Sequence, residues 1–169
     1  MIGFRRMTLD SFLTGCGRNR GENNMAKATF GSISSGTMRP EDLIPDFASE
    51  LEALAKDGAF AELIREANAL EDYESDDADG ILEELFDALN SYAPSYAYFG
   101  AHPGDGADYG FWLCENYQDL MREDDVLEVS DLADVPADYE GAVLLVNDHG
   151  NPSFGQVTGG KIEWEWELV

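Results

Sequence analysis

Within the last nine positions of the chain, 161–169, apolar and polar residues alternate without a break from 161 to 168. The apolar positions are Ile162, Trp164, Trp166 and Leu168, and a glutamate separates each from the next. Because side chains along a strand point alternately to its two faces, this period of two predicts a half-buried β-strand. We expect both tryptophans on the buried face of this strand and the three glutamates in solvent.

Three earlier stretches instead repeat their apolar residues every three or four positions. The first covers 40–56, the second covers 60–70, and the third follows Gly80 and covers 81–89. This spacing predicts three amphipathic helices whose acidic residues face solvent. Proline lacks the backbone N–H that a helix interior uses, so Pro45 is expected to delay the start of the first helix by one turn.

After residue 91 the period shortens to that of strands. Aromatic residues at 92–99 and 109–113 flank a glycine-rich segment, 100–106, which predicts a β-hairpin with a long loop. A short helix is expected at 115–122, before the remaining strands.

Three further strands are expected at 126–129, 142–146 and 154–158, with an acidic loop at 131–140. Gly159-Gly160 joins the last of them to the C-terminal strand, and two glycines in that position are a strong hairpin signal. The whole pattern predicts an α+β protein, with three N-terminal amphipathic helices packed on an antiparallel sheet of about five or six strands.

The composition of the chain changes at residue 38. Residues 1–37 carry five Lys and Arg against two acids and are rich in glycine, serine and asparagine, which predicts a flexible leader. Within this leader, 13–16 resembles the cleavage box of bacterial lipoproteins, but Asp10 interrupts the apolar run that such a signal needs. Residues 38–169 carry the periodic patterns and are expected to form a single acidic α+β domain.

Charge is the feature that bears most directly on function. The chain has 35 Asp and Glu against 10 Lys and Arg, a net charge of −25, and no Lys or Arg lies between Arg65 and Arg122. Such a body repels nucleic acid and anionic membranes and attracts basic protein surfaces through its field. We therefore expect a basic protein surface as the partner, no direct binding of nucleic acid or membrane, and no enzyme activity.

The densest acids lie in two regions, one around the third predicted helix and one at 123–125. The predicted partner-binding residues are Glu71, Asp72, Glu74, Asp76, Asp77, Asp79, Glu83, Glu84, Asp87, Glu123, Asp124 and Asp125. The run 71–80 also suggests calcium, but an EF-hand loop with Gly80 in sixth place needs a glutamate where Phe86 stands. We expect instead a solvated acidic linker that caps the following helix.

Two predicted turns place histidines next to carboxylates. The residues concerned are His102, Asp105, Asp108, Asp148 and His149. If the two turns met, these side chains could hold a metal or perform acid–base chemistry, which makes a metal-dependent enzyme an alternative function. Both segments are also ordinary turn sequences, and no phosphate loop, nucleophile elbow or CxxC motif is present, so no cofactor or metal is predicted.

Cys16 and Cys114 are the only cysteines, and one of them lies in the predicted leader. Two such residues give no disulfide framework, so we expect Cys114 to be a buried, unreactive thiol. This cysteine content favours a reducing cytoplasm. No apolar run in the sequence approaches the roughly 18 residues of a membrane span.

In charge, size and lack of catalytic motifs, the chain resembles DNA-mimic inhibitors of phages and mobile elements, including anti-restriction and anti-CRISPR proteins. The aromatic and glycine-rich stretch 98–112 and the turn 146–151 also resemble small proteins of phages and plasmids. The resemblance implies an acidic protein that occupies the nucleic-acid-binding groove of a host factor. It assigns no role to any residue, and the acids here are spread over the whole body rather than concentrated on one helix.

A second interpretation of the charge is adaptation to high salt, because screening removes the self-repulsion of an acidic surface. Only Lys27, Lys56 and Lys161 are lysines, as such a protein would have. On this interpretation the chain is a halophile-adapted globular protein, and its charge says nothing about its partner.

Overall fold

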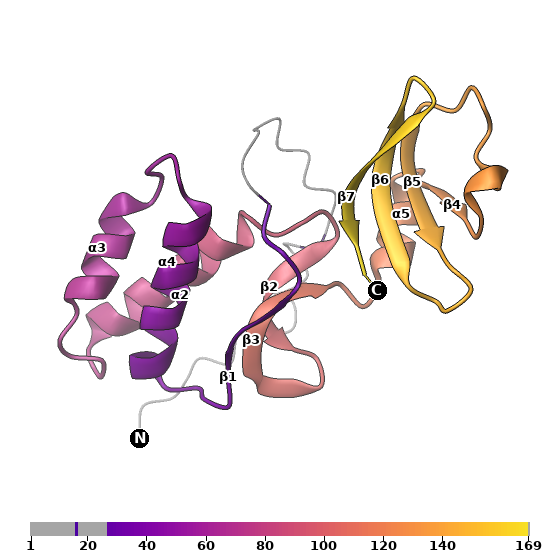
Figure 1. Ribbon diagram of the computed structural model, residues 1–169. Helices are drawn as coiled ribbons and strands as arrows, with labels where there is room; N and C mark the ends of the chain where they lie inside the picture. Colours follow the sequence, from indigo (N-terminus) through magenta and orange to yellow (C-terminus); the bar gives the residue numbers. More distant parts are fainter. Residues whose placement is uncertain (1–15, 17–26, 169) are drawn as a thin grey trace.

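The computed structural model describes Cys16 and residues 27–168, which form an α+β fold (Figure 1). The helices are α2 (Pro40–Leu54), α3 (Ala61–Ala69), α4 (Asp76–Asn90) and α5 (Tyr117–Glu123), with a 3-10 turn, η1, at Leu132–Asp134. The strands are β1 (Gly31–Ser35), β2 (Ala97–His102), β3 (Asp105–Leu113), β4 (Leu127–Val129), β5 (Gly141–Val146), β6 (Pro152–Thr158) and β7 (Lys161–Glu167).

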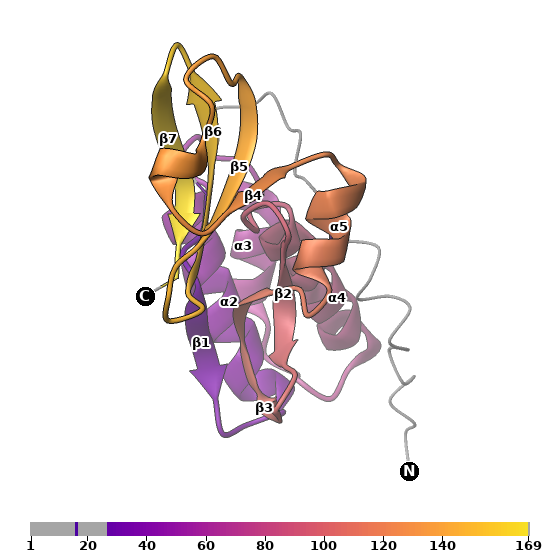
Figure 2. The same ribbon diagram turned by 90° about the vertical axis from the view of Figure 1, so that its right-hand side faces the viewer.

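These strands form two sheets rather than the single sheet predicted from the sequence. Sheet A has the order β1-β3-β2, and sheet B has the order β4-β5-β6-β7. The chain leaves sheet A at the end of β3 and enters α5 before it begins sheet B, and a strand pattern alone does not say which strands become neighbours. In Figure 2 sheet B occupies the upper part of the molecule and sheet A the lower part.

Helices α2, α3 and α4 form a layer against sheet A, on the side away from sheet B (Figure 1). Phe47 of α2 is fully buried, with its ring centroid 5.2 Å from that of Phe86 in α4 and 4.9 Å from that of Phe99 in β2. Leu85 and Leu89 of α4 are buried in the same cluster. The helical spacing of the apolar residues therefore predicted the buried faces correctly.

Two helix starts differ from the prediction. Helix α2 begins at Pro40 and continues through Pro45, because burial of Ile44 and Phe47 on either side outweighs the one backbone hydrogen bond that a proline removes. Helix α4 begins at Asp76, so Gly80 lies inside the helix instead of before it.

Sheet A begins before the predicted domain boundary at residue 38, because β1 pairs along β3. The approach of these two strands is close, since a Cβ on Gly110 of β3 would lie 2.0 Å from the carbonyl oxygen of Gly31. The β2–β3 connection is a short turn at Pro103-Gly104 rather than the long loop predicted, because β3 already begins at Asp105.

Sheet B is mixed, with β4 parallel to β5 and the other pairs antiparallel. One face packs on α5, where Met121 is buried against Leu144 and Phe154. The other face surrounds Val143 and is covered by the segment that carries Tyr139. The predicted β6–β7 hairpin is confirmed, and both residues of its Gly159-Gly160 turn have positive φ, as a type I′ turn requires.

Strand β7 contains a bulge at Glu165 that changes the faces of its tryptophans. Gly155 and Phe154 are consecutive on β6, yet they pair with Trp164 and Trp166, which leaves Glu165 without an opposite residue. One extra residue reverses the alternation of side chains beyond it. Trp166 therefore packs on the α5 side of sheet B and Trp164 packs on the opposite side, so the prediction of one shared face is wrong.

Candidate protein-binding surface

Helix α4 is capped by a residue of the predicted acidic linker, but it starts earlier than the sequence predicted. The side-chain oxygen of Ser75 accepts a hydrogen bond from the backbone N–H of Ala78 at 3.2 Å. Asp76, Asp77 and Asp79 lie in the first turn, where negative charge is stabilised by the helix dipole. The acids at this end of α4 therefore help to form the helix and remain exposed.

We call the acidic side of this helix the α4 face. It consists of exposed residues at Asp76, Asp77, Asp79, Glu83, Glu84 and Asp87. At 100° per residue these positions fall within an arc of roughly 160°, and the opposite side of the helix carries the buried Ala78, Leu85 and Leu89. The same amphipathic pattern that packs α4 on the core thus turns all six carboxylates to solvent.

The α4 face has a charge density close to that of a nucleic-acid strand. At 1.5 Å of rise per residue, Asp76 and Asp87 are separated by about 17 Å along the helix axis. Six carboxylates over this length correspond to roughly one charge per 3 Å, against about one per 3.4 Å for a single strand of duplex DNA.

The connection between α3 and α4 extends this acidic region. Glu71, Asp72 and Glu74 are exposed and directly precede the helix. The Asp72 carboxylate accepts the backbone N–H of Glu74 at 3.0 Å, and the Asp72 carbonyl accepts the Ser75 hydroxyl at 2.7 Å. These bonds order the connection, so its carboxylates have defined positions next to the helix.

The second predicted acidic group lies elsewhere, at the end of α5. Glu123 and Asp125 are exposed, and the Asp124 carboxylate accepts a hydrogen bond from the Tyr96 hydroxyl at 2.9 Å. Helix α5 packs on sheet B, whereas α4 packs on sheet A and the other helices (Figure 1). The two acidic groups therefore belong to different halves of the molecule, and Asp124 holds the start of β2 in place.

Cations neutralise few of these acids. Residues 27–168 contain 33 acidic side chains and six Lys and Arg. Within this range the ion pairs are Lys27–Glu165, Arg39–Glu41, Arg65–Glu62 and Arg122–Asp119, and none involves α4. The last three pairs are largely exposed, and such pairs contribute little stability.

The two histidine turns lie on different sheets. The imidazole of His102 accepts the backbone N–H of Gly104 and contacts the Trp112 ring, while Asp105 accepts the N–H of Ala107. Asp108 accepts a hydrogen bond from the Ser32 hydroxyl. Asp148 and His149 lie in the β5–β6 turn, which Asn147 organises by accepting two backbone N–H groups. Within the described part of the chain, no three His, Cys, Asp or Glu side chains gather as metal ligands would.

The cysteines form a disulfide, which corrects the expectation of a free thiol at Cys114. Cys16 and Cys114 are 98 positions apart in sequence, and Cys114 is 1% exposed in the segment between β3 and α5. The bond ties the chain before β1 to the junction of the two sheets. It also occupies the Sγ atom of Cys16 that lipid attachment would need, and it removes the argument for a reducing cytoplasm.

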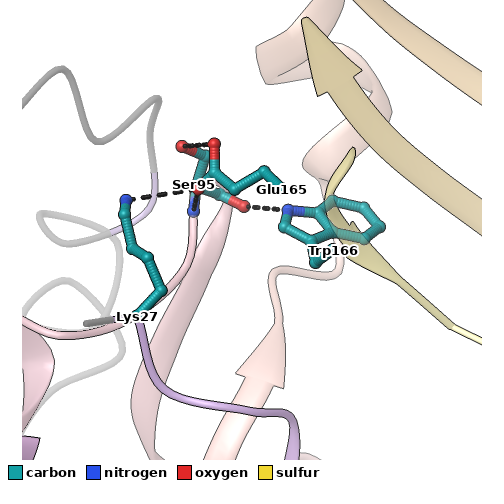
Figure 3. Close-up of polar contacts among 4 residues, drawn as sticks. All are labelled: Lys27, Ser95, Glu165 and Trp166. Atoms are coloured by element: carbon teal, nitrogen blue, oxygen red, sulfur yellow. Dashed lines mark hydrogen bonds and ion pairs between the residues drawn. The ribbon is translucent and has the colours of Figure 1, made fainter. Parts of the chain in front are cut away.

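A polar junction joins the bulge of β7 to the start of β2 (Figure 3). Ser95 is 1% exposed, and its N–H and hydroxyl donate to the two oxygens of the Glu165 carboxylate at 2.8 and 3.1 Å. Its carbonyl accepts the indole N–H of Trp166 at 2.9 Å, and Lys27 pairs with Glu165 at 3.2 Å. Every polar atom of Ser95 is thereby satisfied by β7.

Burial changes the ionisation of four tyrosines. It raises the pKa of Tyr92, Tyr98, Tyr109 and Tyr117, because the charged phenolate is disfavoured away from water. The negative charges of Asp57, Glu115 and Glu128 add to this effect at Tyr92, Tyr98 and Tyr117 respectively. The raised pKa values therefore reflect the packing of these rings in the protein interior.

Sequence reasoning missed the roles of Glu165 and Lys27. Glu165 is exposed, as expected, but its bonds to Ser95 were not predicted because the alternation of β7 carries no mark of a bulge, although a glycine opposite Trp164 is a weak signal of one. Lys27 lies in the predicted leader, and its pairing depends on a residue 138 positions later in the sequence.

Comparison with known proteins adds no assignment. No family model matches the chain, no curated protein matches it, and no solved structure matches it. Among the residues that the structure describes, no helix combines the length and apolar character that crossing a membrane requires. A function must therefore be inferred from the surface itself.

Proposed function

We propose that this protein is a non-catalytic binder of basic protein surfaces and that the α4 face is its main contact. In its narrower form, the proposal is that the protein mimics nucleic acid and inhibits a DNA- or RNA-binding factor. The observation that carries it is the α4 face, whose six exposed carboxylates form no ion pair within residues 27–168 and have roughly the linear charge density of one DNA strand.

The proposal is supported by the structural order of the acidic residues as well as by their charge. The Ser75 cap, the bonds of Asp72 and the buried opposite side of α4 hold the carboxylates on a rigid element. A groove that binds phosphates presents Lys and Arg at fixed spacing, so a rigid row of carboxylates loses less conformational entropy on binding than a disordered acidic tail does.

Adaptation to high salt is the competing explanation of the same charge. It accounts equally well for the acids on every surface, including Glu123 and Asp125 on the other half of the molecule. The two explanations differ in what salt does. Screening weakens contact with a basic partner, whereas it stabilises a fold that is strained by its own charge.

The disulfide indicates the kind of compartment in which the protein meets such a partner. Disulfides persist in oxidising compartments and are rare in the cytosol, so a partner outside the reducing cytoplasm agrees best with the Cys16–Cys114 bond. A cytoplasmic inhibitor of a nucleic-acid-binding factor would instead act with both thiols reduced. Thiol trapping of the protein in its native cells separates these two forms of the proposal.

The experiment is competition with DNA for a basic protein. Purified histone tetramer is loaded with labelled duplex DNA, and the protein is titrated in at low salt and again at high salt. We expect displacement of the DNA at low salt that weakens steeply as salt rises, because the contact is electrostatic. Adaptation to high salt would be favoured by two results together. The protein would displace no DNA at any salt concentration, and its melting temperature would rise strongly with salt.

A further inference from the structure

Trp164 differs from the other two tryptophans in the state of its indole N–H. The Nε1 atom of Trp112 donates to the Gly100 carbonyl at 3.0 Å, and that of Trp166 donates to the Ser95 carbonyl at 2.9 Å. The indole of Trp164 forms no hydrogen bond within residues 27–168, and the residue is partly exposed. Buried indole N–H groups usually find a partner within the protein, so the donor of this partly exposed ring is available to solvent or to a bound partner.

The position of the Trp164 ring is fixed by a glycine. Trp164 pairs with Gly155 across β6 and β7, and a Cβ on Gly155 would lie 2.9 Å from the Cε3 atom of the indole. The ring therefore lies over the glycine, an arrangement that stabilises a glycine within a sheet. Since one side of the ring contacts Gly155, its exposed part is turned away from the sheet.

The bulge places a carboxylate on the same face as this indole. Without it, Trp164 and Glu167 would point to opposite faces; with Glu165 as the extra residue, Glu167 follows Trp164 on the same face. Their partners on β6 are Gly155 and Ser153, two positions apart, so the two side chains are separated by about 7 Å along the sheet. Glu167 is exposed, and β7 is an edge strand of sheet B.

An aromatic face next to a carboxylate is the arrangement that recognises arginine. The planar guanidinium stacks on an indole and donates to a carboxylate with two parallel N–H groups. A lysine ammonium binds both groups less well, because it is compact and strongly hydrated. The surrounding charge favours a cation, since residues 27–168 carry 33 acids against six Lys and Arg.

We propose that Trp164 and Glu167 form an arginine-recognition site for the basic protein partner, in addition to the α4 face. An arginine side chain of the partner stacks on Trp164 and pairs with Glu167. This inference rests on the proposed function and names a feature of the partner: an exposed arginine, not positive charge alone.

The test follows the indole N–H resonances of the full-length protein by proton–nitrogen NMR. A short peptide of alternating arginine and serine is titrated in, and the same peptide with lysine for arginine serves as the comparison. We expect the Trp164 resonance, identified by its loss in Trp164→Phe, to shift with the arginine peptide. Trp112 and Trp166 are internal controls because their N–H groups are already bonded within the protein.

A matched pair of variants tests the carboxylate. Glu167→Gln should weaken binding of the arginine peptide by about two- to five-fold. Glu163→Gln makes the same change of charge on the same strand but on the opposite face, and it should leave the affinity unchanged. Three results would each overturn the inference. They are a Trp164 resonance that does not shift with the arginine peptide, one that shifts equally with the lysine peptide, and one that shifts together with those of Trp112 and Trp166.

The proposed function and the arginine site can be disproved independently of each other. The α4 face loses three charges, and β7 stays intact, in the triple variant Glu83→Gln, Glu84→Gln, Asp87→Asn. If the competition with DNA fails while the Trp164 shift persists, the arginine site stands and the α4 proposal falls. If the competition succeeds while Trp164 does not shift, only the arginine site is withdrawn.

Discussion

The carboxylate of Glu165 accepts a hydrogen bond from the backbone N–H of Ser95, 70 positions earlier in the sequence, at 2.8 Å. Ser95 precedes β2 of sheet A, and Glu165 is the bulge residue of β7 in sheet B. The same bulge turns Trp166 inward, where its indole donates to the Ser95 carbonyl. One extra residue in β7 thus creates both the link between the two sheets and the separation of the two tryptophans.

Glu165→Ala should lower the free energy of unfolding by about 1–3 kcal/mol, because it leaves the buried N–H of Ser95 without its partner. Glu163→Ala is the control on the same strand, since Glu163 is exposed, and it should change stability by less than about 0.5 kcal/mol. Urea unfolding of both variants measures the difference. Equal stability of the two would show that the junction contributes nothing.

Gly155→Ala should destabilise the protein by about 1–3 kcal/mol, because the added methyl group overpacks the site. Its Cβ would lie 2.6 Å from the carbonyl oxygen of Glu163 and 2.9 Å from the Trp164 ring. Gly80→Ala is the contrasting change, since Gly80 lies in α4 with open space around it. Gly80→Ala should raise the free energy of unfolding by about 0.4–1 kcal/mol, because alanine reduces the conformational entropy of the unfolded chain. The melting temperatures of the two variants should therefore change in opposite directions.

Reduction of the Cys16–Cys114 bond should cost about 2–4 kcal/mol of stability, because it frees a loop of nearly 100 residues in the unfolded chain. Cys16→Ser should have the same melting temperature as the reduced wild-type protein. Reductant should then have no further effect on that variant. A wild-type melting temperature that is unchanged after complete reduction, verified by thiol titration, contradicts a structural role for this bond.

Tyr92→Phe should leave stability unchanged or raise it slightly, because the Tyr92 hydroxyl is buried without a partner among the described residues. Tyr96→Phe should instead lower it by about 1 kcal/mol, since the hydroxyl of Tyr96 donates to Asp124. Denaturant unfolding of the pair checks this prediction. If Tyr92→Phe is the more damaging change, the Tyr92 hydroxyl has a hydrogen-bond partner within the protein.

Alkaline pH should destabilise the fold through the buried tyrosines. Their pKa values are raised in the folded state, so the folded protein holds these protons more tightly than the unfolded chain does. The stability that they contribute is complete below the ordinary tyrosine pKa of about 10 and is lost as pH rises through the higher folded values. Melting temperatures across this range should fall less in Tyr98→Phe than in the wild-type protein.

Local patterns predicted the helices well and the strand partners poorly. Phe47, Leu85 and Leu89 recur at helical spacing, and this periodicity determines which side of a helix is buried. Sheet partners depend on contacts between distant residues, so the division into two sheets and the parallel β4–β5 pair have no local signature. The bulge at Glu165 has only one weak local signal, the glycine opposite Trp164, because it follows from how β6 and β7 pair.

The acidic candidate residues were predicted in part. The acids of α4 could be placed on one helical face because helix and face follow from spacing alone. The position of Glu123–Asp125 on a different half of the molecule, and the bond of Asp124 to Tyr96, depend on tertiary packing. Trp164 and Glu167 could not be paired from sequence, since unbroken alternation places them on opposite faces.

On the function proposed above, the carboxylates of the α4 face, rather than total charge, select a basic protein. Two variants with equal net charge test it most directly. One carries Glu83→Gln, Glu84→Gln and Asp87→Asn on α4, and the other carries Asp46→Asn, Glu52→Gln and Glu66→Gln on α2 and α3, where these side chains are exposed.

The measurement is the affinity of each variant for DNA-free histone tetramer at constant low salt. We expect the α4 variant to bind at least about ten-fold more weakly than the wild-type protein, as loss of roughly 1.4 kcal/mol requires, and the α2–α3 variant to bind within about two-fold of it. Equal loss in both variants would show that only overall charge matters and would rule out selection by the α4 face.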